Sequence, residues 1–445
     1  MRQTLLILGA SGDLTARLLL PGLGGLLKSV HAKDLGLVGA GSDDWDDERW
    51  RSLVEKATGM SGLDTRYLKA DVTAEEDLRR LLDACEGQAV VYFALPPRVT
   101  AKACEALTRV GVPDGTSLVM EKPFGTDAES ARRLNELLAQ LVPEDHVHRV
   151  DHFLGTSTVL NIFGVRFANR IVEPVLNAAH VESVEIVFDE TLALEGRAGY
   201  YDGAGALVDM IQSHLLQVLA LVAMDPPPTL HATDVRDAKA QVLRATRVWD
   251  GDPVRSSGRG RYTAGSIDGH ELPSYVDEEG VDPKRKTETF AEVVVEVDTW
   301  RWSGVPFRLR SGKALGSPRA EVAVTFKPPQ RLPEGLTGSD RPDRLRMGIG
   351  LDAGSIALDI DISGPGDPFG LDPATLEASF GAGELPPYGE VLKSLLAGDP
   401  LLTVRGDTAV QCWRIIEPVQ AAWRADRVPL QDYPAGSSGP GTQAG

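Results

Sequence analysis

The chain has 445 residues, of which 46 are Lys or Arg and 64 are Asp or Glu, so its formal net charge is −18. At about 150 residues per domain, this length predicts two or three domains. A composition of 42% hydrophobic and 25% charged residues is typical of a globular protein with a sizeable core, and it excludes a mainly disordered chain. The acidic balance argues against a nucleic-acid-binding surface, and we find no run of about 18 apolar residues that would span a membrane.

The cysteines and the first residues indicate a compartment. Cys85, Cys104 and Cys412 form no CxxC pair, which is typical of reduced thiols in a cytosolic protein. The first apolar run, residues 4–8, leads directly into a glycine turn and is too short for a secretory signal. We therefore expect a cytoplasmic protein without membrane or nucleic-acid partners.

Short apolar runs that end at turn residues alternate with helical stretches in the first third of the chain. Strands are predicted at residues 4–8, 35–40, 66–68, 89–95 and 118–125. Residues 126–129 (TDAE) match a capping box that opens a helix. This alternation is typical of parallel βαβ units, so residues 1–150 are predicted to form an α/β, Rossmann-like, doubly wound domain that binds a dinucleotide.

The pattern changes after about residue 150. Residues 206–224 predict one long apolar helix that ends before three prolines. Residues 290–302, 306–312, 321–326 and 356–362 show the alternation and β-branching of antiparallel strands. Residues 151–445 are therefore predicted to form an α+β domain with a large, mainly antiparallel sheet.

A glycine turn follows the first predicted strand. Gly9 and Gly12 lie between a strand and a helix, where glycines let the backbone approach a pyrophosphate and the helix N-terminus attracts it. The GxxG spacing is shorter than the full GxGxxG fingerprint, so a plain glycine turn remains the alternative. Asp43 and Asp44 follow the second strand with no basic residue beside them; Arg17 is the nearest cation. An acidic side chain there suits a free ribose 2′-hydroxyl, so we expect NAD, with NADP as the alternative.

Longer motifs then follow one another in a fixed order along the chain. They are GASGDL (9–14), FALPP (93–97), EKPFG (121–125), RVDHFLG (149–155), EGRAGYYD (195–202), DMIQSHLLQ (209–217), TETF (287–290), WRWSGVPFRLRSGKAL (300–315) and AGSSGP (435–440). With this ordered set of motifs the chain resembles the glucose-6-phosphate dehydrogenase family from Gly9 to about Pro440.

The resemblance implies oxidation of a sugar's anomeric hydroxyl to a lactone, with hydride transfer to a nicotinamide. His214 matches the base that removes the hydroxyl proton, a role that suits the near-neutral pKa of imidazole. Without the resemblance, a lone histidine on an apolar helix would be interpreted as a core residue. Asp151 matches the carboxylate that orients this base and stabilises its protonated form.

The resemblance also assigns the remaining site residues. It implies a Lys122–Pro123 bond that is cis, a second domain that binds the sugar, and assembly into a homodimer or homotetramer. We expect no metal, and His146 and His148, which have no matching ligand cluster, are expected to face solvent. The implied substrate-binding residues are Lys122, His152, Glu195, Asp209 and Lys313, and the implied cofactor-binding residues are Gly9, Ser11, Gly12, Asp13, Leu14, Asp43, Ala94, Leu95, Pro96 and Lys122.

Three departures affect the groups that hold phosphates. The family's phosphate clamp has a tyrosine and a lysine where this chain has Phe153 and Thr156. The basic residue expected beyond Lys313 falls at or near Pro318, with Arg319 adjacent. The family's arginine for a cofactor 2′-phosphate is missing from the loop at 41–44. Charge-assisted hydrogen bonds to phosphate are the strong ones, so these losses should weaken phosphate binding.

Three interpretations stay open. The substrate is a sugar other than glucose 6-phosphate, altered at carbon 6. Alternatively, it is glucose 6-phosphate itself, held by a rearranged clamp that uses His152 with Arg170 or Arg319. The third interpretation is a catalytically weak, nucleotide-binding paralogue with a regulatory or scaffold role.

Overall fold

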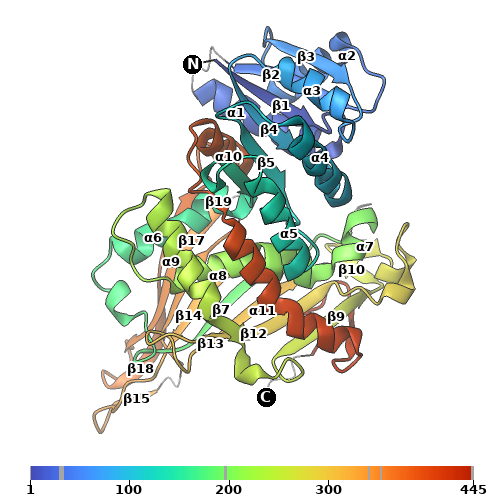
Figure 1. Ribbon diagram of the computed structural model, residues 1–445. Coiled ribbons are helices and arrows are strands. Elements are labelled where there is room, and N and C mark those ends of the chain that lie inside the picture. Colours follow the sequence, from blue (N-terminus) through green and yellow to red (C-terminus); the bar gives the residue numbers. More distant parts are fainter. Residues whose placement is uncertain (1, 30–34, 195–197, 339–340, 351–352, 442–445) are drawn as a thin grey trace. The chain divides into compact units, whose positions relative to one another are not determined.

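A computed structural model describes residues 2–29, 35–194, 198–338, 341–350 and 353–441 (Figure 1). Its contacts divide the chain into two compact units. The first comprises Met1–Ser157, Pro227–Asp237 and Gly383–Trp413, and the second comprises Thr158–Pro226, Ala238–Ala382 and Arg414–Gly445. The first unit therefore includes two segments from much later in the chain. No pattern in the sequence predicts their inclusion.

The first unit is built on a seven-stranded sheet with the order β19-β6-β5-β4-β1-β2-β3. Neighbouring strands are parallel except for β19, which runs antiparallel to β6. Ile7 and Leu8, consecutive residues of β1 whose side chains point to opposite faces, are both fully buried, as expected of a parallel sheet covered on both faces. The strands are β1 Gln3–Leu8, β2 Leu35–Gly41, β3 Thr65–Lys69, β4 Gln88–Phe93, β5 Ser117–Glu121, β6 Val147–Val150 and β19 Thr403–Val404.

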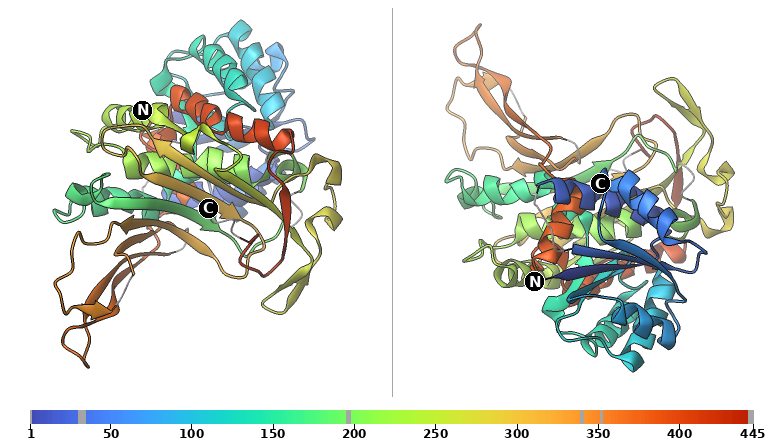
Figure 2. Two further views of the ribbon diagram at one scale, coloured as in Figure 1. Left: turned by 90° about the horizontal axis from the view of Figure 1, so that it is seen from below. Right: turned by 90° about the horizontal axis from the view of Figure 1, so that it is seen from above.

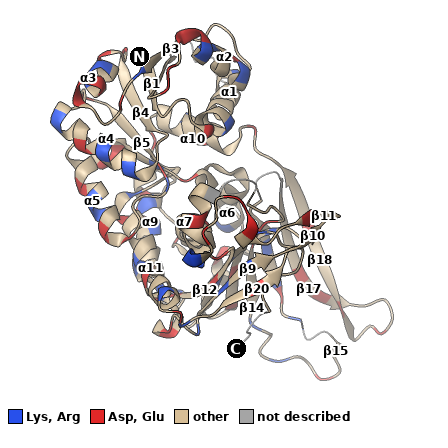
Figure 3. Ribbon diagram, turned by 90° about the vertical axis from the view of Figure 1, so that its right-hand side faces the viewer, with Lys and Arg blue, Asp and Glu red and all other residues tan. Residues whose placement is uncertain are grey.

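Helices connect these strands and mix charges of both signs on their outer faces (Figure 3). The capping box of α5 lies one residue later than predicted: Asp127 is the N-cap, and its carboxylate accepts the Ser130 N–H at 2.7 Å. The Ser130 hydroxyl in turn accepts the Asp127 N–H at 3.1 Å. The helices are η1 Thr15–Leu19, α1 Leu20–Ser29, α2 Asp47–Thr58, α3 Glu75–Asp83, α4 Pro97–Val110, α5 Ala128–Ala139, η2 Glu144–His146, η3 His152–Gly155 and α10 Pro387–Leu396, with the first half of α11 Gly406–Arg424.

The second unit is built on an eleven-stranded sheet with the path β15-β18-β17-β16-β14-β7-β13-β12-β9-β20, and β8 pairs with β12. Most pairs are antiparallel, and β13–β7, β20–β9 and β15–β18 are parallel. Figure 2 shows the long hairpin of β17 and β18 extending from one end of this sheet. The predicted fold class is therefore confirmed. The strands are β7 Val181–Asp189, β8 Thr246–Val248, β9 Ser257–Thr263, β12 Phe290–Val297, β13 Pro306–Gly312, β14 Arg319–Phe326, β15 Thr337–Gly338, β16 Arg344–Gly348, β17 Ala353–Ser363, β18 Gly370–Gly381 and β20 Leu430–Pro434; a separate hairpin has β10 Gly265–Ile267 and β11 His270–Leu272.

One long apolar helical segment packs inside this unit. It has three parts, α7 Ala198–Ala206, the π-helical η5 Leu207–Leu215 and α8 Leu216–Ala223, and the backbone of Gly205 is non-helical, with φ 67° and ψ 174°. The uninterrupted part after Gly205 agrees with the helix predicted over residues 206–224. Contrary to the expectation of no such run, residues 199–223 are long and apolar enough to span a membrane by length and composition, but 89% of the apolar window is buried inside the fold. The other helices with bounds in this unit are α6 Ser157–Phe167, η4 Glu173–Val175, α9 Ala232–Ala245, η6 Trp249–Gly251, η7 Tyr275–Asp277 and η8 Pro283–Arg285, α6 and α9 each having its first residues in the first unit.

The expectation that His146 and His148 face solvent is wrong for the second of them. His148 lies on β6 between buried neighbours and is 0% exposed, whereas His146 is half-buried. Neither ring nitrogen of His148 has a hydrogen-bond partner among the described residues. Burial, with a smaller contribution from the charge of Arg236, lowers the pKa of His148 to about 4. Both faces of β6 are covered, so His148 lies in the core as a neutral imidazole.

This buried imidazole predicts a pH-dependent stability. The unfolded chain takes up a proton near the ordinary pKa of 6.5 while the folded chain resists it down to about 4, so stability is lost as the pH falls through this window. When the pH is lowered from 7 to 5.5, the free energy of unfolding measured in urea should fall by about 1 kcal/mol more for the wild type than for His148→Leu. His146→Leu is the matched control and should behave as the wild type. An equal pH effect in all three proteins would contradict the prediction.

Candidate functional site

The glycine turn after β1 fits a dinucleotide pyrophosphate. Gly9 has φ +88°, and a Cβ added to it would lie 2.2 Å from the Ala94 carbonyl oxygen. The turn is fixed because the Gly9 N–H donates to the Ala40 carbonyl at 2.8 Å and the Gly12 N–H to the Gly9 carbonyl at 3.0 Å. Glycine is therefore required at position 9, and the cradle opens onto the start of a helix, where backbone N–H groups attract an anion.

The predicted cofactor residues of this turn continue into η1. Ser11, Asp13 and Leu14 lie between Gly9 and the first residue of η1, and Asp13 accepts a hydrogen bond from Arg17 at 3.2 Å. Both members of this pair are exposed. Arg17, the cation expected nearest to the loop after β2, therefore has a carboxylate partner four residues before it.

A second cation lies beside the loop after β2, where the sequence analysis found none. Lys69, the last residue of β3, places its Nζ 3.0 Å from Asp44 Oδ1. The Asp43 carbonyl accepts the Tyr67 hydroxyl at 3.3 Å. Lys69 is 25 residues from Asp44 in the sequence, so only the parallel pairing of β2 with β3 brings it to this loop.

The other predicted cofactor residues lie at the carboxyl ends of the neighbouring strands. Ala94, Leu95 and Pro96 follow β4, and Lys122 follows β5 with a cis bond to Pro123, as expected. Because the strands are parallel, these ends share one edge of the sheet with Gly9, which is where open α/β sheets bind ligands.

A half-buried carboxylate next to Lys122, Glu121, was not among the predicted site residues. Glu121 accepts a hydrogen bond from the Tyr92 hydroxyl, and burial raises its pKa to about 7, with Lys122 acting in the opposite direction. The charge and hydrogen bond of Glu121 add to burial in raising the pKa of Tyr388 above its usual range. Tyr388 reaches this cluster from α10, more than 260 residues later in the chain, which is why no local pattern signals it.

Asp151 and His152 stand where β6 passes into η3. Asp151 is 2% exposed and caps η3, its Oδ1 accepting the Phe153 N–H at 3.0 Å. The His152 ring stacks on Tyr388 with 5.8 Å between ring centroids and 14° between planes. At the two altered clamp positions, Phe153 and Thr156 are both 2% exposed, and the Thr156 hydroxyl donates to the His152 carbonyl at 3.2 Å.

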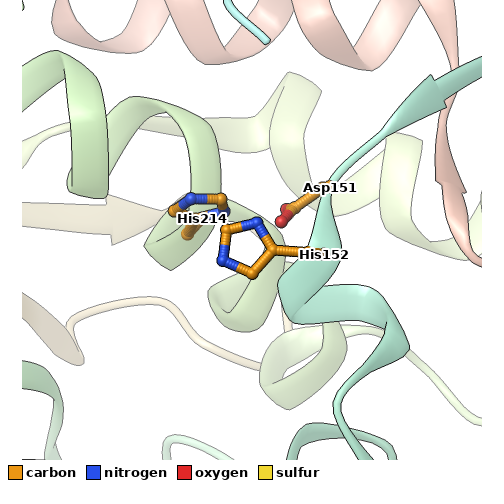
Figure 4. Close-up of side chains that lie close together, drawn as sticks. All are labelled: Asp151, His152 and His214. Carbon is orange, nitrogen blue, oxygen red and sulfur yellow. The ribbon is translucent and has the colours of Figure 1, made fainter. Parts of the chain in front are cut away.

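His214 and Asp209 belong to the second unit, on the π-helical η5. His214 is 1% exposed and Asp209 is half-buried. Runs of π-helix are rare and frequently mark functional sites. Figure 4 shows the side chain of His214 leaving its helix, and those of Asp151 and His152 leaving the end of β6.

Lys313 lies in a largely buried ion pair that the sequence analysis did not foresee. Its Nζ is 2.7 Å from Glu190 Oε2 and 5.4 Å from the centroid of the Tyr201 ring, and the residue is 8% exposed. Glu190 follows β7, a strand parallel to the β13 that precedes Lys313. Glu195, predicted from the motif at residues 195–202, lies outside the described residues.

Arg319, the suggested substitute for the missing clamp cation, already has two partners. Its guanidinium donates to Glu321 at 2.8 Å and to Glu185 at 3.1 Å. Arg170, the other suggestion, is exposed on the segment after α6. The described contacts therefore give neither arginine a role at the clamp.

Known proteins place this chain in one family. The model of the glucose-6-phosphate dehydrogenase NAD binding domain matches residues 6–161, and that of the C-terminal domain of the same enzyme matches residues 163–444. Glucose-6-phosphate 1-dehydrogenase of Gluconobacter oxydans is 38% identical over 98% of this chain and 94% of its own length, and that of Treponema pallidum is 37% identical over 98% and 92%.

Solved structures agree with these matches. A structure of glucose-6-phosphate dehydrogenase in complex with its substrate glucose-6-phosphate has a TM-score of 0.86 and 28% identity, covering 99% of this chain and 96% of that one. Glucose-6-phosphate 1-dehydrogenase from Mycobacterium avium has a TM-score of 0.84 and 31% identity, covering 99% and 95%. The expected family resemblance is therefore confirmed over the whole chain.

The geometry at Gly9 predicts that substitution by alanine destabilises the protein much more at Gly9 than at Gly12. Gly9→Ala combines a left-handed backbone with a clash against the Ala94 carbonyl, and should reduce the free energy of unfolding by about 2 kcal/mol or more. Gly12→Ala is the control, because its new methyl group would meet only the Gly9 carbonyl, at 3.1 Å. Urea unfolding of both variants checks this; equal stabilities would show that the turn relaxes freely.

Proposed function

Because the chain belongs to the glucose-6-phosphate dehydrogenase family, we propose that it is a nicotinamide-dependent dehydrogenase that oxidises the anomeric hydroxyl of a hexose 6-phosphate to the lactone. The observation that carries the proposal is the conjunction of a pyrophosphate cradle at Gly9 with buried Asp151 and His214 inside matching motifs. Relatives named glucose-6-phosphate 1-dehydrogenase, aligned over 98% of the chain, support the choice of sugar.

In the proposed reaction this chain supplies the base and its support. The bound nicotinamide accepts hydride from carbon 1 of the sugar. His214 removes the proton of the anomeric hydroxyl, and Asp151 orients the imidazole and stabilises its protonated form. Burial of both side chains keeps water from competing for that proton, which favours transfer from the sugar.

Five further side chains are proposed to position the sugar. Carboxylates accept hydrogen bonds from several sugar hydroxyls at once, which suits Asp209 and Glu195, and ammonium groups bind hydroxyl or phosphate oxygens. The ion pair with Glu190 holds the Lys313 ammonium in one place before substrate binds. Lys122 and His152 complete the set, the latter braced by the Tyr388 ring.

We propose NAD as the preferred cofactor, with NADP as the alternative. Asp43 and Asp44 would repel a ribose 2′-phosphate, and an acidic side chain at this loop accepts a hydrogen bond from a free 2′-hydroxyl. Lys69 and Arg17 are each neutralised by a carboxylate, Asp44 and Asp13 respectively. A 2′-phosphate would have to displace one of these carboxylates.

The altered clamp bears on how the phosphate is held. Phe153 removes a hydroxyl and Thr156 removes a charge, and each lost bond to a charged group weakens binding by roughly 10- to 150-fold. We therefore propose weak binding of glucose 6-phosphate. The same two residues favour a second candidate substrate, an unphosphorylated hexose, for which a cationic clamp has no use.

Initial rates of absorbance change at 340 nm, with glucose 6-phosphate and with glucose against NAD and NADP, test this function. We expect turnover of glucose 6-phosphate with a high KM and a preference for NAD. His214→Ala should lower kcat by at least about 100-fold, because general-base catalysis contributes roughly that much or more. Turnover of glucose alone would select the second candidate, and no turnover of any hexose would favour a nucleotide-binding paralogue.

Restoring the clamp charge separates the two sugars. Thr156→Lys should lower the KM for glucose 6-phosphate by about tenfold or more while leaving the KM for glucose unchanged, since the new ammonium can bind only the phosphate. Thr156→Met controls for the longer side chain at this buried position and should leave both constants near the wild-type values. A similar KM change in both variants, or for both sugars, would contradict a charge effect.

A further inference from the structure

A polar cavity lies wholly within the second unit. Its volume is about 410 Å³, and its walls come from the junction of α7 and η5, from η8 and the residues after it, from β9, and from the end of α11. None of the residues assigned above to the sugar or the cofactor lines it. The lining residues are Ala204, Leu207, Val208, Arg259, Lys284, Arg285, Lys286, Glu288, Gln420, Trp423, Arg424 and Asp426.

The charge of the lining is opposite to that of the chain. Five lining residues are Lys or Arg and two are acidic, in a protein of net charge −18. One of the five, Arg285, is paired at 3.3 Å with Asp202, which lies outside the lining. Burial also raises the pKa of Glu288 to about 7, so near neutral pH this carboxyl offers only part of a negative charge. Concentrating like charges around one cavity is costly unless an anion occupies it.

Two of the cations have no carboxylate partner. Within the described part of the chain, Lys284 and Arg424 form no ion pair, and both side chains are exposed at the cavity. Lys286 and Arg259, in contrast, share Asp426 at 2.5 and 3.1 Å. The cavity thus has a neutralised wall and, facing solvent, two cations available for a ligand.

The cavity also has a rigid aromatic wall. Trp423 is 5% exposed, its indole N–H donates to the Ser257 hydroxyl at 2.9 Å, and the Arg259 guanidinium lies 5.7 Å from its ring centroid. Arg259 is itself buried and donates to the Val428 carbonyl at 3.0 Å. These fixed groups make a preformed site rather than a set of loose surface lysines.

We propose that this cavity binds a small phosphorylated ligand. A phosphate group carries about 1.5 to 2 negative charges near neutral pH, which matches the two lining cations that have no carboxylate partner among the described residues, Lys284 and Arg424. The volume is within the range of pockets that hold small metabolites. This proposal does not rest on the proposed function.

The cavity is connected to the start of η5. The Glu288 carboxylate, which lines the cavity, accepts the Leu207 N–H at 3.0 Å, and the Glu288 carbonyl accepts the Ala206 N–H at 3.2 Å. Leu207 is the first residue of the helix that carries Asp209 and His214. An anion bound beside Glu288 would therefore affect the hydrogen bonds that hold the start of η5. This makes the cavity suited to a ligand that regulates the residues on that helix.

Isothermal titration with inorganic pyrophosphate tests the site. The double variant Lys284→Gln, Arg424→Gln removes the two unpaired cations without exposing a buried carboxylate. The matched control, Lys327→Gln with Arg331→Gln, removes one exposed lysine and one exposed arginine from the segment after β14, outside the cavity. We expect the Kd for pyrophosphate to rise at least tenfold in the cavity variant and to stay within twofold in the control.

Each other result overturns the proposal. Absence of binding to the wild type, equal binding to all three proteins, or an equal loss in both variants would show that the cavity is no specific site. Thermal unfolding confirms that the variants are folded. Pyrophosphate held at the glycine turn would be unaffected by the cavity variant, so only the difference between the two proteins reports on the cavity. Competition experiments, in which ADP or a hexose bisphosphate displaces pyrophosphate from the cavity, then identify a nucleoside or a sugar ligand. Either outcome supports the site.

Discussion

The first unit depends on the close approach of one turn to the end of a neighbouring strand. The backbone of Gly9 lies so close to the Ala94 carbonyl that no side chain fits between them. The turn after β1 is therefore held against the end of β4. The parallel register then places the residues after β4, β5 and β6 along one edge. The cofactor loop, Lys122 and Asp151 all take their positions from this arrangement. A single backbone conformation thus determines where chemistry is available.

Two carboxylates, the half-buried Glu121 and the buried Glu288, hold elements that surround this chemistry. Glu121 links β5 to Tyr92, and Glu288 binds the free N–H at the start of η5. Burial raises the pKa of both carboxyls to about 7, which means that each is retained at a desolvation cost offset by specific hydrogen bonds. Such groups fix unique geometry better than apolar contacts do, because a displaced partner leaves a polar atom unsatisfied.

Local patterns predicted much of the fold and part of the site. Five of the seven strands of the first sheet follow from short apolar runs that end at turn residues, because a parallel strand is buried on both faces. The other two, β6 and β19, were not predicted. The expectation for His148 was wrong because all four residues of β6 are buried, so the strand has no solvent-facing side. The two polar residues in the middle of β6 hide this, because they leave no apolar run in the sequence. Lys69, Glu190 and Tyr388 were missed for a different reason. Each reaches its partner through strand pairing or packing between segments far apart in the chain, which no window of sequence contains.

The path of the chain between the two units has a consequence for synthesis. The first unit is complete only when residues 383–413 have been added, because β19 forms its edge strand and α10 brings Tyr388 against His152. While the ribosome is still synthesising the residues of the eleven-stranded sheet, the seven-stranded sheet of the first unit therefore has an open edge at β6 and an uncovered apolar face. An unpaired edge of this kind invites wrong pairing. A chain truncated after the first 150 residues would carry this defect permanently, so the unit defined by contacts cannot be cut out as one continuous piece of sequence.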